Sequence, residues 1–270
     1  MKITFLGGGN MAAALIGGLC KQGFDAKNVQ VVELSADNRA RLETTFGVRA
    51  AESLDAAALA CDVLVLAVKP QQMKAALAPL AGQLAEQVVV SIAAGLRLAD
   101  LSRWLGGYTR LVRAMPNTPA LIGAGITGLF ADASVSEAGR QAADQVLCAV
   151  GSTVWVPEEG QIDAVTAVSG SGPAYVFHFI EALEAAGIAQ GFDAATARKL
   201  AIDTMLGAAR LAASSEESPA VLRERVTSKG GTTEAALKSF AADGFVAMVG
   251  RAVDAAAARG RELGEQLGRD

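Results

Sequence analysis

The chain has 270 residues, of which 51% are hydrophobic and 19% are charged, and its formal net charge is −4. This length and apolar content predict a folded protein of one large or two medium domains and exclude intrinsic disorder. Interspersed charges exclude a basic nucleic-acid surface, and no run reaches the roughly 18 uncharged apolar residues of a membrane span. We therefore expect neither a nucleic-acid nor a membrane partner.

The first predicted element leads into a glycine-rich turn. A short apolar β-type run precedes Gly7, and a helix-forming run follows Gly9. Together with Ala12 these glycines match the spacing G-x-G-x-x-G/A, in which a strand, a tight turn and a helix N-terminus receive a dinucleotide pyrophosphate. Because the motif directly follows a strand, it predicts nucleotide binding rather than a plain turn. The contacts expected in this glycine turn come from Gly7, Gly9, Asn10 and Met11.

Strand and helix patterns then alternate along the N-terminal half. Further strands are expected at 29–34, 62–68, 88–92, 109–114, 125–130 and 152–156, with helices at 10–22, 36–45, 53–60, 71–85, 97–105 and 136–150. Strands separated by helix-length segments predict right-handed crossovers and an open sheet covered on both faces. The fold class expected is α/β: an N-terminal Rossmann-type, doubly wound, mostly parallel sheet followed by an all-helical C-terminal domain.

The sequence changes character near Pro157. Beyond it only helices are expected, at 160–168, 172–190, 194–214, 219–226, 231–242 and 245–267. We therefore predict a dinucleotide-binding Rossmann domain at 1–157 and an all-helical substrate-binding and dimerisation domain at 158–270. Several of these helices are apolar on more than one face, which a small monomeric domain cannot bury. This pattern predicts a homodimer formed through the helical domain.

The end of the second strand bears on the choice between NAD and NADP, because the adenosine ribose binds there. If the strand stops at Leu34, the 2′-phosphate of NADP meets hydroxyl, amide and cationic side chains at a helix N-terminus. Those side chains belong to Ser35, Asn38 and Arg39. If the strand stops at Val32, Glu33 would repel the phosphate and NAD would be favoured. We favour NADP, although Arg39 is equally well explained as a solvated helix residue.

Three further segments follow strands at the edge where open α/β sheets bind ligands. Lys69 lies at a strand-to-helix junction, where its charge would face the cofactor. Small residues after the next strand let a flat nicotinamide ring approach the backbone, and Asn117 follows another strand between two prolines. The residues expected to contact the cofactor here are Ala67, Val68, Lys69, Pro70, Ala93, Ala94, Gly95 and Asn117.

A second glycine motif lies in the helical domain. Gly230 and Gly231 precede Thr232, Thr233 and a helical run. Free N–H groups and hydroxyls at such a helix start would hold a small carboxylate. An ordinary capped helix explains the same residues, and the pattern alone leaves the two interpretations open.

These motifs, in this order and spacing, resemble pyrroline-5-carboxylate reductases over essentially the whole chain. The segments that carry the resemblance are 7–11, 67–70, 93–95, 115–119, 169–175 and 227–237. The resemblance implies NADPH-dependent reduction of the cyclic imine 1-pyrroline-5-carboxylate to L-proline, the last step of proline synthesis, with NADH as a weaker donor. Family members also form assemblies larger than dimers, which this sequence alone does not predict.

The resemblance also implies roles for particular residues. Backbone N–H groups of Gly230, Gly231, Thr232 and Thr233 would bind the substrate carboxylate. The hydroxyl of Thr233 would reach the ring nitrogen, which makes it the one catalytic side chain expected. A family glutamate maps onto Glu216, although a surface glutamate pair is the simpler explanation. The chain departs from the family at Lys229, where proline is frequent, and at Arg225, where some members have asparagine.

Two other functions are weighed against this one. A β-hydroxyacid dehydrogenase needs a lysine base on a helix at the cleft, and neither Lys199 nor Lys238 lies in such a motif. A non-catalytic sensor of NADP needs no substrate pocket, which leaves the second glycine motif unexplained. The only histidine, His178, lies in an apolar run and is expected to be packed rather than catalytic. Reduction of a protonated imine needs no strong base.

Cysteine usage and the start of the chain suggest the compartment. Cys20, Cys61 and Cys148 are odd in number, far apart and set in apolar or helix-like runs. They are expected to be reduced packing residues without metal, as in a cytoplasmic protein. The fold begins within the first residues, so no signal peptide is expected.

Overall fold

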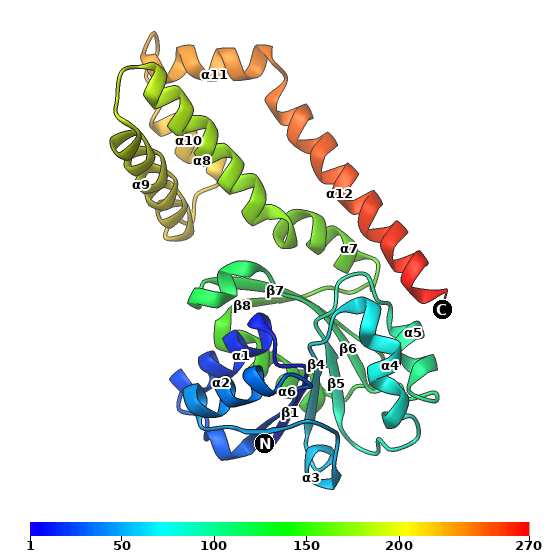
Figure 1. The fold of residues 1–270 in the computed structure, drawn as a ribbon. Coiled ribbons are helices and arrows are strands. Elements are labelled where there is room, and N and C mark those ends of the chain that lie inside the picture. Colours follow the sequence, from blue (N-terminus) through cyan, green and yellow to red (C-terminus); the bar gives the residue numbers. More distant parts are fainter. Residues whose placement is uncertain (270) are drawn as a thin grey trace. The chain divides into compact units, whose positions relative to one another are not determined.

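A computed structural model describes residues 1–269, which form two compact units (Figure 1). The sheet unit comprises Met1–Ser171 and the chain from Ala256 onward, and the helical unit comprises Gly172–Ala255. The first segment of the sheet unit therefore extends 14 residues beyond the predicted boundary at residue 157, to Ser171. The last turns of the C-terminal helix also belong to the sheet unit. The roles predicted for 1–157 and 158–270 remain predictions.

The sheet unit is built on eight strands in the order β3-β2-β1-β4-β5-β6-β7-β8. All neighbouring pairs are parallel except β6 and β7. The strands are β1 (Ile3–Leu6), β2 (Val29–Val32), β3 (Arg49–Ala51), β4 (Val63–Leu66), β5 (Val88–Ser91), β6 (Leu111–Met115), β7 (Gly125–Ala131) and β8 (Gly151–Trp155). This arrangement confirms the predicted doubly wound, mostly parallel sheet.

Helices cover both faces of the sheet, with α1, α2 and α6 on one face and α4 and α5 on the other (Figure 1). Strand residues alternate between two cores: Phe5 and Val65 pack beneath the first group, and Leu6 and Leu66 beneath the second. The helices are α1 (Asn10–Lys21), α2 (Ala36–Phe46), α3 (Ala56–Leu59), α4 (Met73–Leu77), α5 (Leu98–Trp104), α6 (Glu137–Leu147) and α7 (Gln161–Val165).

The helical unit contains α8 (Gly172–Ala189), α9 (Ala194–Ala213), α10 (Pro219–Arg225), α11 (Thr232–Ala242) and the first turns of α12 (Phe245–Gly268). Helices α8 and α9 pack against each other. The ring of Phe245 lies 6.4 Å from that of Phe179 and 5.4 Å from that of Phe240, measured between centroids. The helix boundaries agree closely with those predicted, which confirms the helical C-terminal region. None of the helices described in residues 1–269 is long and apolar enough to cross a membrane.

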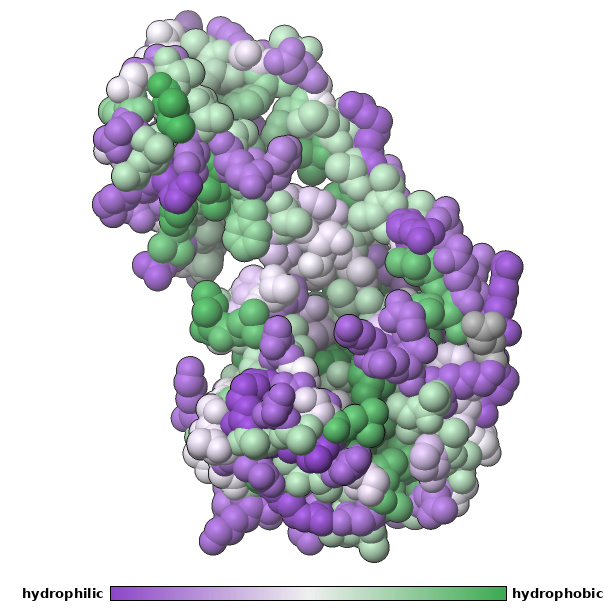
Figure 2. All heavy atoms as spheres, in the orientation of Figure 1, coloured by the Kyte–Doolittle hydropathy of each residue, from purple (hydrophilic) through white to green (hydrophobic). Residues whose placement is uncertain are grey.

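Many apolar side chains remain on the outside of the helical unit, where Figure 2 shows them in green. Val246 is 83% exposed within the single chain, and Phe177 is 62% exposed. The His178 side chain is 87% exposed and lies 3.2 Å from Glu181. The expectation that His178 is packed is therefore wrong for the single chain, because its run faces outward on α8.

One strand that was not predicted and two predicted elements that are shorter than expected are the main differences from the structure. Strand β3 was not expected, and the helix predicted at 71–85 is shorter, ending at Leu80 after a turn that contains Pro79. The strand predicted at 29–34 ends at Val32, and the side chain of the next residue, Glu33, accepts from the Gly8 N–H of the glycine turn.

Candidate active site

The glycine turn joins the ends of three neighbouring strands. The Gly7 N–H donates to the Val32 carbonyl at 2.8 Å, and the Ala67 N–H donates to the Leu6 carbonyl at 2.8 Å. Gly7 has a φ of +101°, and a Cβ there would lie 2.7 Å from the Ala67 carbonyl oxygen. Only glycine fits this turn, which lies where the strand order reverses between β1 and β4, the usual ligand position in such sheets.

The start of α1 offers an open anion site. Gly9 is its N-cap, no side chain caps the helix, and the first turn holds no acidic residue. A Cβ at Gly9 would meet nothing within 4 Å, and Gly9 and Asn10 are exposed. First-turn N–H groups without capping side chains, next to open space, fit a dinucleotide pyrophosphate.

The residues after β2 bond to one another. The Ser35 hydroxyl accepts from the Asn38 N–H at 3.3 Å and so caps α2. Arg39 donates from Nη1 to the carbonyls of Glu33 and Leu34, at 2.7 and 2.8 Å. The hydroxyl and cation predicted to meet a 2′-phosphate are thus already engaged. Their cofactor contacts, with that of Asn38, remain predictions.

The next two strands place the other predicted cofactor residues along the same edge. The Ile92 N–H donates to the Leu66 carbonyl at 3.2 Å, so Ala93, Ala94 and Gly95 follow β5 beside the end of β4. Ala67, Val68, Lys69 and Pro70 follow β4, and the Lys69 side chain is exposed. The backbone brings these segments together with the glycine turn.

The C-terminal helix reaches the loop after β5. A Cβ at Gly264 of α12 would lie 2.6 Å from the Gly95 carbonyl oxygen. Leu267 packs against the core between the sheet and α5, and Arg103 donates to the Gly268 carbonyl at 2.6 Å. The absence of a side chain at Gly264 therefore lets the end of the chain cover the loop predicted to approach the nicotinamide.

Asn117 is buried and uses its side chain to link neighbouring segments. Its Nδ2 donates to the Ser169 carbonyl at 3.1 Å, and its Oδ1 accepts from the Ile126 N–H at 3.0 Å. These bonds tie the loop after β6 to β7 and to the turn that ends the sheet unit's first segment. The predicted cofactor contact of Asn117 is untested, and the structure adds this connecting role.

A buried ion pair joins β6 to α7 and was missed in the sequence. Arg113 of β6 is 2% exposed, and its Nη2 lies 2.6 Å from Asp163 Oδ1 of α7. Its Nη1 lies 3.5 Å from Glu159, whose carboxylate also accepts from the Leu98 N–H at 2.7 Å. A charged residue inside an apolar strand is the one sequence signal for such a pair.

The second glycine motif lies in the helical unit, at the start of α11. Gly231 is the N-cap without a side-chain cap, and Gly230 has a φ of +73°. The Gly230 N–H donates to Glu234 at 2.8 Å, and the Gly231 N–H donates to the Ser228 carbonyl at 3.0 Å. Two of the four predicted N–H groups are therefore used within the turn, which leaves those of Thr232 and Thr233 at the uncapped helix start.

The other residues predicted near this motif are also in the helical unit. Glu216 is exposed between α9 and α10, while its neighbour Glu217 forms an ion pair with Arg225. Arg225, where the chain departs from the family, is thereby held on the surface, and Lys229 is exposed. No structural role distinguishes Glu216 from a surface residue.

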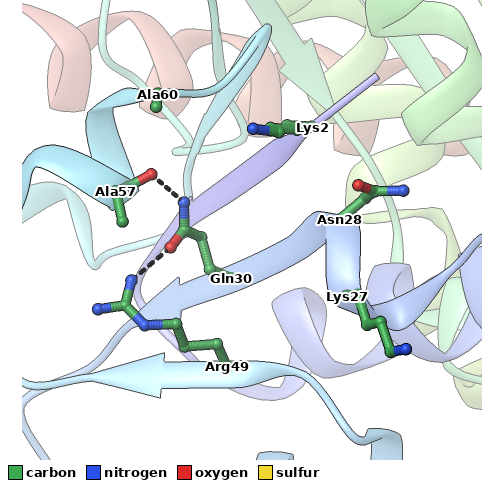
Figure 3. A pocket seen from close by; sticks show the side chains of 7 residues that line it. All are labelled: Lys2, Lys27, Asn28, Gln30, Arg49, Ala57 and Ala60. Carbon is green, nitrogen blue, oxygen red and sulfur yellow. Dashed lines mark hydrogen bonds between the residues drawn. The ribbon is translucent and has the colours of Figure 1, made fainter.

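A separate hollow of about 280 Å³ opens at the amino ends of the strands, the edge opposite the glycine turn (Figure 3). It is lined by Lys2, Lys27, Asn28, Gln30, Arg49, Ala57 and Ala60. The Gln30 amide bonds both Arg49 and the Ala57 carbonyl. A hydrogen bond from Arg49 lowers the pKa of the Asp55 carboxyl to about 2. Gln30 and Arg49 are therefore engaged with each other and with neighbouring groups.

The described part of the chain contains neither a cluster of metal ligands nor an activated cysteine thiol. Residues 1–269 contain no group of three or more His, Cys, Asp or Glu side chains placed to hold a metal ion. The three cysteines are free, and burial raises the pKa of the Cys20, Cys61 and Cys148 thiols. A raised pKa lowers the thiolate fraction and with it the reactivity.

Comparison with known proteins covers the whole chain. A family model described as pyrroline-5-carboxylate reductase dimerisation matches residues 159–263, and one described as NADP oxidoreductase coenzyme F420-dependent matches residues 2–95. A pyrroline-5-carboxylate reductase of Pseudomonas aeruginosa is 52% identical over 99% of this chain and 98% of its own. One of Vibrio alginolyticus is 43% identical over 97% of each chain.

Solved structures of pyrroline-5-carboxylate reductases also match this chain over nearly its whole length. A pyrroline-5-carboxylate reductase from Coxiella burnetii aligns with a TM-score of 0.93 and 42% identity, covering 97% of this chain and 98% of its own. The Plasmodium falciparum pyrroline carboxylate reductase with NADP bound aligns with a TM-score of 0.85 and 28% identity, covering 98% of each chain.

The sheet with its glycine turn, together with these matches, defines an NADP-dependent oxidoreductase with a helical C-terminal region. The predicted cofactor class is thus confirmed. The chain belongs to the pyrroline-5-carboxylate reductase family, as the motifs in its sequence indicated.

Proposed function

We propose that this protein reduces 1-pyrroline-5-carboxylate to L-proline, with NADPH as hydride donor, as the last step of proline biosynthesis. The observation that carries the proposal is whole-length similarity to enzymes named for this substrate, at 52% identity in one case. The substrate is a small carboxylate with a reactive C=N bond. Two helix starts without side-chain caps, at α1 and α11, give the chain anion sites for both reactants.

The glycine turn and the start of α1 would hold the cofactor pyrophosphate. The open space at Gly9 and the exposed backbone of Asn10 support this assignment. The loops after β4 and β5 would surround the nicotinamide ring. When bound, NADPH would supply a hydride to the carbon of the protonated imine, and the π electrons of the C=N bond would become the lone pair of the amine nitrogen, which already carries its proton.

The start of α11 would hold the substrate. The N–H groups of Thr232 and Thr233 would bind the carboxylate, since those of Gly230 and Gly231 already have partners. The Thr233 hydroxyl both donates and accepts, so it would hold the ring nitrogen as that atom changes from iminium to amine. Orientation of two bound reactants supplies most of the rate in such a site.

Thr233→Ala is expected to lower kcat with the imine by roughly 10- to 100-fold, because a hydrogen bond to a charged group is lost. NADPH affinity should stay within about twofold, since the glycine turn is untouched. Steady-state NADPH oxidation and fluorescence titration of the cofactor measure the two effects. Thr233→Ser, which keeps the hydroxyl, should recover most of the rate. Full activity in Thr233→Ala would show that the Thr233 hydroxyl has no part in the reaction.

We also propose that the chain assembles as a homodimer through the helical unit and works in the cytoplasm. The dimerisation match over 159–263 and the exposed apolar side chains of this unit support the assembly. Free thiols support a reducing compartment. The molar mass measured in solution distinguishes a dimer from an assembly of several dimers.

Placing charges on the apolar surface of the helical unit should prevent this assembly. In the double variant Phe177→Glu with Val246→Glu, two exposed apolar side chains become carboxylates that a dimer would have to bury. Light scattering coupled to size exclusion should then give the monomer mass, with helix content retained by circular dichroism. The control Thr44→Glu adds a carboxylate on exposed α2 of the sheet unit and should leave the mass unchanged. An unchanged mass in the double variant would place the interface elsewhere.

A further inference from the structure

The carboxylate of Glu33 occupies a defined position at the cofactor edge of the sheet. Strand β2 ends at Val32, so Glu33 is the first residue beyond it. Its Oε2 accepts from the Gly8 N–H of the glycine turn, and its Oε1 accepts from the Ser35 N–H, both at 2.8 Å. Two backbone donors therefore fix the carboxylate between the turn after β1 and the start of α2.

The glycine turn is shaped to admit this side chain. A Cβ at Gly8 would lie 3.2 Å from both Cγ and Oε2 of Glu33, and 2.7 Å from the Leu42 side chain. Any larger residue at position 8 would displace the carboxylate or Leu42. The position of Glu33 thus follows from the middle glycine of the turn.

The nearby cations are already bound to other groups. Arg39 Nη1 donates to the carbonyls of Glu33 and Leu34, and its Nη2 lies 3.6 Å from Glu52. Arg41 donates to the Gly8 carbonyl at 3.3 Å. Among the contacts described, no cation is bonded to the Glu33 carboxylate, which accepts from the Gly8 N–H of the glycine turn.

We propose that Glu33 determines cofactor specificity: its carboxylate accepts hydrogen bonds from the adenosine ribose hydroxyls and opposes a 2′-phosphate, so that NADH is an effective donor beside NADPH. This inference rests on the proposed use of the glycine turn for the cofactor. An acidic residue after the second strand of a dinucleotide fold meets the ribose in this way.

The chemistry of the Glu33 carboxylate favours a ribose with two free hydroxyls, as in NADH, over one that carries a 2′-phosphate, as in NADPH. An ionised carboxylate accepts at about four lone-pair positions, and backbone N–H groups use two of those on Glu33. The remaining positions accept from hydroxyls. A 2′-phosphate replaces a hydroxyl donor with negative charge, which the carboxylate repels and which the engaged Arg39 only partly offsets.

Titration calorimetry with ADP-ribose and 2′-phospho-ADP-ribose tests the inference without the nicotinamide and without turnover. For the unaltered protein, the two dissociation constants should lie within about tenfold of each other. Glu33→Gln should weaken the binding of ADP-ribose and strengthen the binding of 2′-phospho-ADP-ribose. The ratio of the two dissociation constants should shift by about tenfold or more in favour of the phosphorylated ligand. NADH and NADPH titrations should show the same shift.

Glu52→Gln is the matched control, because it removes an exposed carboxylate paired with Arg39 and leaves Glu33 in place. It should change the ratio by less than about twofold. A ratio that Glu33→Gln leaves unchanged, or a native preference for the phosphate above about a hundredfold, would overturn the specificity role while the reductase function stands. Failure of both ligands to bind the unaltered protein would overturn the proposed cofactor site as well.

Discussion

Asp163→Ala is expected to lower the free energy of unfolding of the sheet unit by about 3 kcal/mol or more, the largest stability effect predicted for a single side chain here. The change leaves the Arg113 guanidinium buried with only the longer contact to Glu159, 3.5 Å away. Arg113 Nε already lacks a partner, so the site has no spare acceptor to compensate. Removing one member of a buried pair strands the other charge away from water.

Urea titration followed by tryptophan fluorescence measures this effect in the right unit, because both tryptophans, Trp104 and Trp155, belong to the sheet unit. Arg110→Gln is the control, since it breaks the ion pair with exposed Glu86 and should cost less than about 1 kcal/mol. Asp163→Ala combined with Arg113→Met removes both charges and should recover part of the loss. An unaltered urea midpoint in Asp163→Ala would show that the pair contributes no stability.

Gly9→Ala is expected to weaken NADPH binding by about tenfold or more while leaving the free energy of unfolding within about 0.5 kcal/mol. The new methyl group enters open space in the free protein, where nothing lies within 4 Å. It would stand where the cofactor pyrophosphate must approach the backbone. Fluorescence titration with NADPH and urea unfolding separate the two effects.

Gly7→Ala provides the contrasting case within the same turn. Its methyl group would lie 2.7 Å from the Ala67 carbonyl oxygen, on a backbone with a φ of +101°. Strain and overpacking together should cost roughly 2 to 4 kcal/mol. If Gly9→Ala retained full NADPH affinity, the pyrophosphate would have to bind away from the start of α1.

The sequence predicted the fold well because the apolar strands and the alanine-rich helices carry strong local patterns. Strand β3 was missed because Arg49, Ala50 and Ala51 have no strand pattern of their own and pair only because β2 lies beside them. Local propensity carries no record of such tertiary contacts. The helix predicted at 71–85 was too long for a local reason: the alanine- and leucine-rich composition was followed past Pro79 and Gly82, the two residues that mark its end.

The cofactor edge shows the same limit. Glycine spacing located the turn, but it did not show that β2 ends at Val32 rather than Leu34, nor that the next residue, Glu33, accepts a hydrogen bond from Gly8 of the preceding loop. The partners of Asn117 and Arg113 lie about 50 residues away in the chain, at Ser169 and Asp163. One sequence offers no means to pair residues so far apart. It also gave no reason to expect that the N–H groups of Gly230 and Gly231 are used internally.

The return of α12 to the sheet unit makes the helical unit an insertion rather than a tail. The chain leaves the sheet unit after Ser171 and re-enters it at Ala256, and the contact of Gly264 with Gly95 secures the second junction. A chimera that exchanges the helices of two relatives therefore needs two crossover points. A protease cut between α9 and α10 would leave both fragments in the sheet unit, one through the sheet itself and the other through the end of α12, where Leu267 packs against the core and the Gly268 carbonyl accepts from Arg103.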